Sequence, residues 1–198
     1  MKKICVFCGS SLGKQNIYKE TANELALFMA KNKIDLIYGG ANVGVMKVIA
    51  DTIMDNGGKA IGIMPKLLVE KEVAHEELDE MHIVSSMAER KELMIEMSDA
   101  FIALPGGFGT LDEISEVLTA NQLRISDKPI GLLNIDNFFT PLLNFIDHCV
   151  SEGFVRKEHR RNIIVSSEID DLIDKMDQYQ PLSMGKWIDD IKQESSSN

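Results

Sequence analysis

The sequence predicts an α/β protein: a Rossmann-like, doubly wound parallel sheet flanked by helices. Three observations predict this fold class. Short apolar runs alternate with segments of helical period along the chain. Most of the apolar runs are continuous, as expected for strands that are buried on both faces. Glycine clusters follow several of these runs, where an open parallel sheet binds its ligands.

The order of elements supports one parallel sheet. Seven short apolar runs are predicted as strands: Ile4–Cys8, Asp35–Tyr38, Lys59–Met64, Met81–Val84, Ala100–Leu104, Pro129–Leu133 and Asn162–Val165. Six segments with helical spacing are predicted as helices: Ile17–Lys31, Val43–Asn56, Ser86–Met97, Thr110–Leu123, Phe138–Glu152 and Glu168–Gln180. This alternation favours right-handed crossovers with helices on both faces of the sheet.

Length and composition fit a single domain. The chain has 198 residues, 44% of them hydrophobic and 26% charged, which is enough for one full-sized core. We expect one Rossmann-like domain over residues 1–192, with a short last helix around Lys186–Ile191. The polar segment 193–198 is expected to be a disordered tail. The formal net charge of −10 repels phosphate backbones, so nucleic acid is not an expected partner.

The sequence indicates neither a membrane protein nor a metalloprotein. No apolar stretch approaches the roughly 18 residues of a membrane helix, and no signal peptide is expected. The odd count of three cysteines favours a reducing, cytoplasmic location. Cys5 and Cys8 lie on opposite faces of a predicted strand, so we interpret them as structural. The four histidines show no metal-binding spacing, and no metal site is expected.

Glycine clusters end three predicted strands on one edge of the sheet. They are Gly9-Ser10, Gly39-Gly40, and the run Pro105-Gly106-Gly107-Phe108-Gly109-Thr110. After the third, a helix begins near Thr110, where free amides and the helix dipole favour an anion that glycine lets approach closely. We therefore predict a phosphate site, although the chain lacks the Walker A and GxGxxG patterns. The alternative is that each cluster is only a tight turn between strand and helix.

Glu113 has two interpretations. Thr110 to Glu113 reads T-x-x-E, a capping box in which the glutamate would bond the first amide of its own helix. In the functional interpretation, the carboxylate lies one turn from a bound phosphate, close to the group that carries the phosphate. Leu111, Ile114 and Leu118 are expected to pack on the sheet.

Arg90 stands on the apolar side of a predicted helix. Met87, Arg90, Met94 and Met97 share one helical face, after a second capping box formed by Ser86 and Glu89. A guanidinium on such a face needs a partner, and Arg90 could reach the strand-end crevice. Alternatively, its side chain extends past the stripe into solvent. The neighbouring lysine, at position 91, could equally be a plain surface residue.

Two motifs identify a family resemblance. The segment Pro105–Glu113 reads PGGFGTLDE and fits PGGxGTxxE, while Met87, Arg90 and Lys91 fit M-x-x-R-K. With these motifs, the chain resembles the LOG (LONELY GUY) family of cytokinin riboside 5′-monophosphate phosphoribohydrolases, often labelled "possible lysine decarboxylases". The similarity covers most of the chain up to about Val165. Two glycines of the family's second loop are replaced, by Ala41 and Lys47.

The resemblance implies hydrolysis of the N-glycosidic bond of adenosine 5′-monophosphate or an N6-modified form, giving free base and ribose 5-phosphate. It implies that Arg90 and Glu113 are the catalytic pair. The expected substrate-binding residues are Gly9, Ser10, Gly39, Gly40, Glu72, Met87, Lys91, Pro105, Gly106, Gly107, Phe108, Gly109, Thr110 and Thr119. It further implies a homodimer or higher oligomer with no metal and no cofactor.

Two other classes remain as alternatives. One is a non-catalytic carrier of a phosphorylated ligand, similar to the molybdenum-cofactor carriers, which have a comparable fold and glycine loops. The Arg90 and Glu113 pair disfavours it. The other is a pyridoxal-phosphate decarboxylase, for which the sequence gives no reason to expect a Schiff-base lysine.

Overall fold

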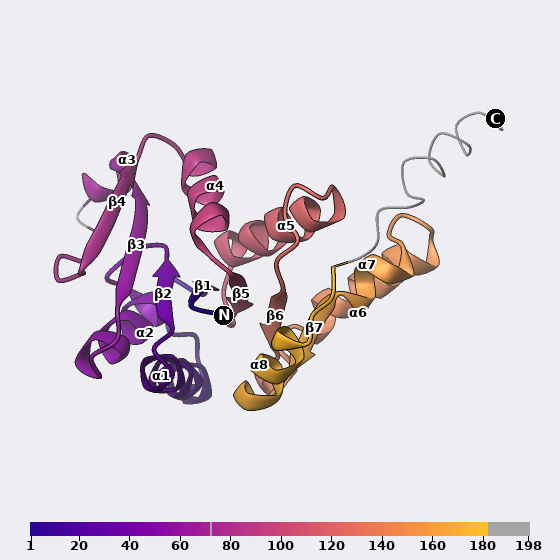
Figure 1. The fold of residues 1–198 in the computed structure, drawn as a ribbon, viewed down its shortest axis with the longest axis horizontal. Coiled ribbons are helices and arrows are strands. Elements are labelled where there is room, and N and C mark those ends of the chain that lie inside the picture. The colour runs from indigo at the N-terminus through magenta and orange to yellow at the C-terminus, as the bar shows by residue number, and fades with distance from the viewer. Residues whose placement is uncertain (72, 182–198) are drawn as a thin grey trace.

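The protein forms one sheet of seven parallel strands (Figure 1). The structure, a computed structural model, describes residues 1–71 and 73–181. The strands are β1 (Lys3–Phe7), β2 (Asp35–Tyr38), β3 (Ala60–Pro65), β4 (Glu80–Val84), β5 (Ala100–Ala103), β6 (Ile130–Leu133) and β7 (Ile163–Ser166). Their order is β4-β3-β2-β1-β5-β6-β7, and every neighbouring pair is parallel. The predicted Rossmann-like sheet is therefore confirmed.

Helices cover both faces of the sheet. The longer ones are α1 (Asn16–Lys31), α2 (Gly44–Asp55), α4 (Met87–Met97), α5 (Phe108–Gln122), α6 (Thr140–Ser151) and α8 (Ile169–Asp177). The short ones are α3 (Lys66–Val69), the 3-10 turn η1 (Ile135–Asn137) and α7 (Lys157–Arg161). In Figure 1, α1 and α2 lie on one side of the sheet and α4 and α5 on the opposite side. Two separate cores follow from this three-layer arrangement.

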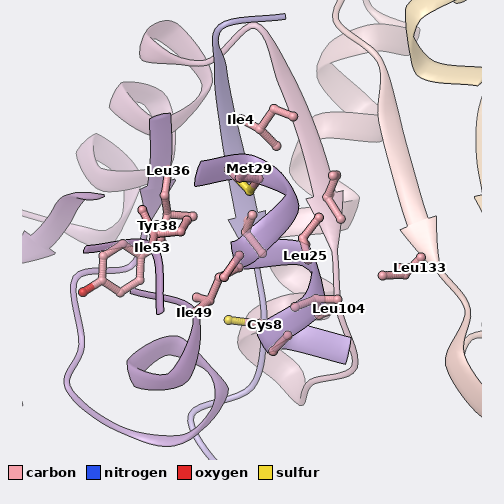
Figure 2. Close-up of a cluster of buried hydrophobic side chains, with 14 of the residues drawn as sticks. Ile4, Cys8, Leu25, Met29, Leu36, Tyr38, Ile49, Ile53, Leu104 and Leu133 are labelled. Atoms are coloured by element: carbon pink, nitrogen blue, oxygen red, sulfur yellow. The ribbon is translucent and has the colours of Figure 1, made fainter. Parts of the chain in front are cut away.

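Successive side chains along a strand face the two cores in turn. Ile4 and Val6 of β1 face the core formed with α1, α2 and α8, part of which is shown in Figure 2. Cys5 and Phe7 face the core formed with α4, α5 and α6. Cys8 returns to the first core, so the two thiols of the CxxC lie on opposite faces, as the strand period predicts.

The predicted boundaries agree closely with the structure. Each predicted strand ends within one residue of the observed limits. The helices α3 and α7 and the turn η1 are not predicted, because three to five residues are too few to show a helical period. Leu111 was expected to pack on the sheet but is 40% exposed, and Val117 lies in the core with Ile114 instead. Met87 is exposed as well, so the predicted apolar face of α4 begins at Arg90.

Some predictions lie outside the described residues. These are the short helix at Lys186–Ile191, the tail at 193–198 and the substrate contact at Glu72. Across residues 1–71 and 73–181, none of the helices has the length and apolar character needed to span a membrane.

Candidate active site

Three loops meet at the carboxyl edge of the sheet. The strand order reverses between β1 and β5, and an open parallel sheet binds ligands at such a switch point. The Gly9 amide donates to the Pro105 carbonyl at 3.2 Å, which joins the loops after β1 and β5. The Val45 amide donates to the Gly9 carbonyl at 3.1 Å, which joins the loop after β2. Gly44, with φ of +57°, lies so close to Ser10 that a Cβ would be 2.3 Å from the Ser10 carbonyl carbon. The structure thus brings the three predicted glycine clusters together.

The loop after β5 combines a tight base with an open tip. A Cβ on Gly106 would lie 2.1 Å from Thr110 Oγ1 and 2.9 Å from the Gly9 nitrogen. Only glycine fits there without moving the backbone of the neighbouring loop. A Cβ on Gly107 or Gly109 would meet no atom within 4 Å. A ligand therefore has room to approach the backbone at the tip of this loop.

The helix that carries Glu113 begins earlier than the sequence predicts. α5 starts at Phe108 with Gly107 as its N-cap residue, and the Leu111 amide donates to the Gly107 carbonyl at 3.1 Å. Thr110 is therefore inside the first turn, and the capping-box interpretation of Glu113 is wrong because that glutamate lies too far along the helix. Glycine has no capping side chain, so the first amides of α5 lack a partner in their own helix, an arrangement that suits a phosphate.

The helix that carries Arg90 is capped as the sequence predicts. Ser86 is the N-cap residue of α4, and the Glu89 amide donates to Ser86 Oγ at 3.1 Å. The Glu89 carboxylate accepts a hydrogen bond from the Ser85 amide at 2.7 Å. This is one residue before the N-cap amide that the usual capping box would use. The fixed first turn places Arg90 on the inner side of α4, below the end of the neighbouring strands.

Arg90 and Glu113 form a buried ion pair beneath the loops. Arg90 Nη1 lies 3.2 Å from Glu113 Oε1, and the residues are only 9% and 7% exposed. Arg90 Nε donates to the Ile63 carbonyl of β3 at 3.0 Å. Arg90 Nη2 fills the space beside Gly39, where a Cβ would be 2.1 Å away. The alternative in which Arg90 extends into solvent is therefore wrong.

The pair has unusual electrostatics. Burial raises the pKa of Glu113 to about 7, against an opposing effect of the Arg90 charge. The Asp112 carboxylate raises this pKa further, and the Lys91 ammonium lowers it. At neutral pH, the carboxyl group is therefore poised between its two protonation states, the condition under which a side chain exchanges protons most readily.

The other predicted site residues lie at different places. Phe108 is 92% exposed at the rim of an apolar cavity of about 350 Å³ between the starts of α5 and α6. Lys91 links α4 to α5 through ion pairs with Asp112 at 3.1 Å and Glu116 at 2.9 Å. Thr119 is exposed in a separate groove of about 610 Å³ between α4 and α5. The geometry does not bring Thr119 to the glycine loops.

Two parts of the site were missed by sequence reasoning. The Ile63 carbonyl holds Arg90, but a backbone group has no sequence signal. His75 is buried, and its amide donates to the Gly40 carbonyl at 2.9 Å in the loop after β2. In the sequence, His75 is a single histidine shortly before a predicted strand, and such a position does not indicate a particular role.

The described residues contain no group of three or more His, Cys, Asp or Glu side chains arranged to hold a metal ion. What they do contain is a set of joined glycine loops and the start of α5 at a switch point, with a buried carboxylate and guanidinium beneath them. The fold and the site together define a Rossmann-like protein with a candidate small-molecule site at the carboxyl edge of its sheet.

Comparison with known proteins is more specific. Residues 46–176 match the family described as "Possible lysine decarboxylase", and the chain belongs to this family. It is 45% identical to the probable cytokinin riboside 5′-monophosphate phosphoribohydrolase LOGL2 of Oryza sativa subsp. japonica, over 94% of this chain and 78% of that protein. It is 46% identical to LOG of the same organism, over 91% and 74%, and 44% identical to LOG3 of Arabidopsis thaliana, over 91% and 84%. The resemblance inferred from the motifs is confirmed.

Solved structures share the fold at lower identity. The molybdenum cofactor binding protein of Rippkaea orientalis has a TM-score of 0.68 and 23% identity, over 90% of this chain and 97% of that one. The molybdenum cofactor carrier protein of Chlamydomonas reinhardtii has a TM-score of 0.67 and 22% identity, over 89% and 96%. Such likeness shows a common architecture and does not assign a ligand.

Proposed function

We propose that this protein is a phosphoribohydrolase that cleaves the N-glycosidic bond of adenosine 5′-monophosphate or its N6-modified forms. The products are the free base and ribose 5-phosphate. Support comes from curated relatives at 44–46% identity, which are named as cytokinin riboside 5′-monophosphate phosphoribohydrolases. The chain covers at least 74% of each of these proteins.

The observation that carries the proposal is the position of the buried Arg90–Glu113 pair beside a phosphate cradle. Cleavage of an N-glycosidic bond develops positive charge on the ribose ring. A carboxylate held close to C1′ stabilises that charge, and the attraction is stronger where water is excluded from the site. The carboxylate of Glu113 lies one turn from the first amides of α5, on the helix that would bind the phosphate. Phosphate binding and charge stabilisation thus come from a single rigid element.

The phosphate provides the binding energy that orients the sugar. Held on the amides at Phe108, Gly109 and Thr110, it fixes the ribose while the bond breaks. Water adds to C1′, and Glu113 accepts the proton that this water loses. The electron pair of the broken bond leaves with the base, which takes a proton from solvent. No second carboxylate is assigned to protonate the leaving group.

Arg90 holds Glu113 in place in this proposal. Its guanidinium is fixed by the Ile63 carbonyl at 3.0 Å, so the contact with Glu113 at 3.2 Å has a defined direction. The same charge lowers the Glu113 pKa, which burial raises. Arg90 therefore keeps enough of the carboxylate ionised at neutral pH for it to act as a base.

Several further features are proposed. Contacts from Lys91 and Thr119 to the substrate and a homodimer follow from the resemblance. A single domain follows from the length of the chain, and a cytoplasmic location from its odd count of cysteines. Lys91 is within electrostatic reach of Glu113. Thr119 lies in the groove between α4 and α5, so a Thr119→Ala variant with wild-type kinetics would remove it from the site. Sedimentation equilibrium measures the oligomeric state.

The test uses Glu113→Gln, which keeps the size of the side chain and removes its charge. We expect the variant to bind AMP, as measured by calorimetry, but to release no adenine, as measured by liquid chromatography. Glu24→Gln is the matched control and should behave as wild type, because Glu24 is an exposed residue of α1 at the other face of the sheet. A Glu113→Gln enzyme that cleaves at the wild-type rate would disprove the role of this residue.

The wild-type assay tests the activity itself. AMP, GMP, CMP and an N6-prenylated AMP are compared as substrates, and the one with the highest kcat/KM identifies the preferred base. If AMP and its prenylated form bind but neither loses its base, the protein is a binding or carrier protein and the hydrolase proposal is wrong.

A further inference from the structure

A second buried pair contains the His75 side chain, which the proposed mechanism does not use. His75 Nε2 is 2.8 Å from Asp51 Oδ1, and His75 is only 4% exposed. The Glu77 amide donates to His75 Nδ1 at 3.3 Å, so the ring proton is on Nε2 and is donated to Asp51. Both ring nitrogens therefore have a partner, as a buried imidazole requires.

This histidine holds the loop that follows β2. The His75 amide donates to the Gly40 carbonyl at 2.9 Å, and the Asn42 amide donates to the Val73 carbonyl at 2.9 Å. Ala41 and Ala74 form an isolated antiparallel bridge between these two bonds. The loop 40–42 is thus paired with the segment 73–75 as in a two-stranded ribbon.

Asp51 connects this ribbon to a helix. It lies on α2, which begins directly after the same loop. Lys47 of α2 pairs with the second carboxylate oxygen of Asp51 at 2.9 Å. Burial raises the pKa of Asp51, but hydrogen bonds from Lys47 and His75 outweigh it and keep this pKa below its usual value. The carboxylate is therefore charged while it accepts the hydrogen bond from His75 Nε2.

The loop in turn contacts the guanidinium of Arg90. Gly39, directly before the paired segment, leaves no room between its Cα and Arg90 Nη2, since a Cβ would be 2.1 Å from that nitrogen. Gly40 has φ of +74° and packs on Gly62 of β3. A shift of the loop would therefore displace Arg90, and with it the carboxylate of Glu113.

We infer that Asp51 and His75 are a positioning pair that fixes the loop after β2 against Arg90 for the hydrolytic step. The inference rests on the proposed function. It concerns residues that touch neither the phosphate cradle nor the reacting carboxylate, and that act through Gly39 and Gly40. Removal of the His75 side chain should lower kcat more than it changes KM, because the phosphate cradle at α5 is untouched.

The test compares three variants of the full-length protein. His75→Leu removes both hydrogen bonds of the ring, and His75→Gln keeps an amide donor close to the position of Nε2. His82→Leu is the matched control, since it breaks a similar pair with Glu80 at 2.7 Å on the edge strand β4. Base release gives kcat and KM, and hydrogen exchange by mass spectrometry reports the amides of segments 40–42 and 73–75.

We expect His75→Leu to lower kcat by about tenfold or more with KM changed less than about threefold, as for a small misplacement of a catalytic group. Exchange should become faster in the two paired segments, His75→Gln should restore most of kcat, and His82→Leu should match wild type. A wild-type kcat in His75→Leu, a change in KM alone, or no rescue by His75→Gln would overturn the inference.

Two further measurements separate the possible failures. If His75→Leu does not fold, Asp51→Asn is used instead, because the Asp51 side chain is partly exposed. This variant should also lower kcat. Unchanged kcat in that variant would refute the pair. If the wild-type protein releases no base, the proposed function is wrong, while unchanged exchange in His75→Leu would independently show that His75 does not hold the loop.

Discussion

The pH dependence of base release follows directly from the burial of Glu113. Its ordinary pKa of 4.5 is raised to about 7, chiefly because the folded protein removes the carboxylate from water. This difference corresponds to roughly 3 kcal/mol in favour of the protonated acid. If the carboxylate accepts a proton from the attacking water, the rate should follow the ionised fraction of this group.

The size of the effect can be calculated. For a pKa of about 7, roughly one tenth of the carboxyl groups are ionised at pH 6, half at pH 7 and nine tenths at pH 8. At saturating substrate, kcat should therefore rise about fivefold between pH 6 and pH 7 and about twofold between pH 7 and pH 8. A bound phosphate dianion close to Glu113 would move the inflection upward and not downward.

The pH dependence of the unfolding free energy is an independent test of the Glu113 pKa. A pKa that is raised on folding favours the folded state below the unfolded value and loses that contribution as the pH passes the folded value. The unfolding free energy of the wild type should therefore fall relative to Glu113→Gln between about pH 4.5 and pH 7, by up to about 3 kcal/mol. Subtracting the unfolding free energy of the variant from that of the wild type removes the contribution of the titratable groups that both proteins share.

The assay measures adenine release under saturating AMP from pH 5 to pH 9, together with urea unfolding of both proteins. A flat kcat between pH 5.5 and pH 8.5, or an inflection near 4.5, would show that Glu113 is not the titrating base. A rate that falls as the pH rises through 7 would assign it the role of an acid and refute the proposed mechanism.

Two other predictions concern the scaffold of the site. Gly39→Ala places a Cβ 2.1 Å from Arg90 Nη2. We therefore expect kcat to fall at least about tenfold and the unfolding free energy to fall by about 1–3 kcal/mol. Activity at the wild-type level would show that the Arg90 side chain moves aside without loss of function. As a comparison for stability only, Gly109→Ala inside α5, where a Cβ would meet no atom within 4 Å, should stabilise the unliganded protein by about 0.5–1 kcal/mol in thermal unfolding. Ser86→Ala removes the acceptor of the Glu89 amide at the start of α4 and should cost about 1 kcal/mol, measured by urea unfolding. No loss of stability in that variant would mean that water replaces the cap without penalty.

The strands and the longer helices could be predicted from the residue pattern along the chain. Continuous apolar runs such as Ile4–Cys8 are short and are bounded by glycine, so strand limits could be predicted to within one residue. The position of the phosphate loop also followed from the chain, because glycines at the ends of parallel strands gather on one edge of the sheet. The family was indicated by two motifs that contain Arg90 and Glu113.

The start of α5 could not be predicted from local pattern. T-x-x-E favours Thr110 as the cap, but the backbone at Gly106 and Gly107 turns tightly enough for the helix to begin at Phe108. Local side-chain preferences act within one turn, while this start is fixed by contact with the loop after β1. The capping interpretation of Glu113 failed for that reason.

The contacts within the site depend on how distant parts of the chain pack together. Arg90 and Glu113 come from different helices, and their contact depends on how α4 and α5 pack on the same face of the sheet. The carbonyl of Ile63 and the space beside Gly39 then hold the guanidinium. Burial raises the Glu113 pKa to about 7. Desolvation depends on all the atoms around a group, and no spacing of residues along the chain specifies those atoms.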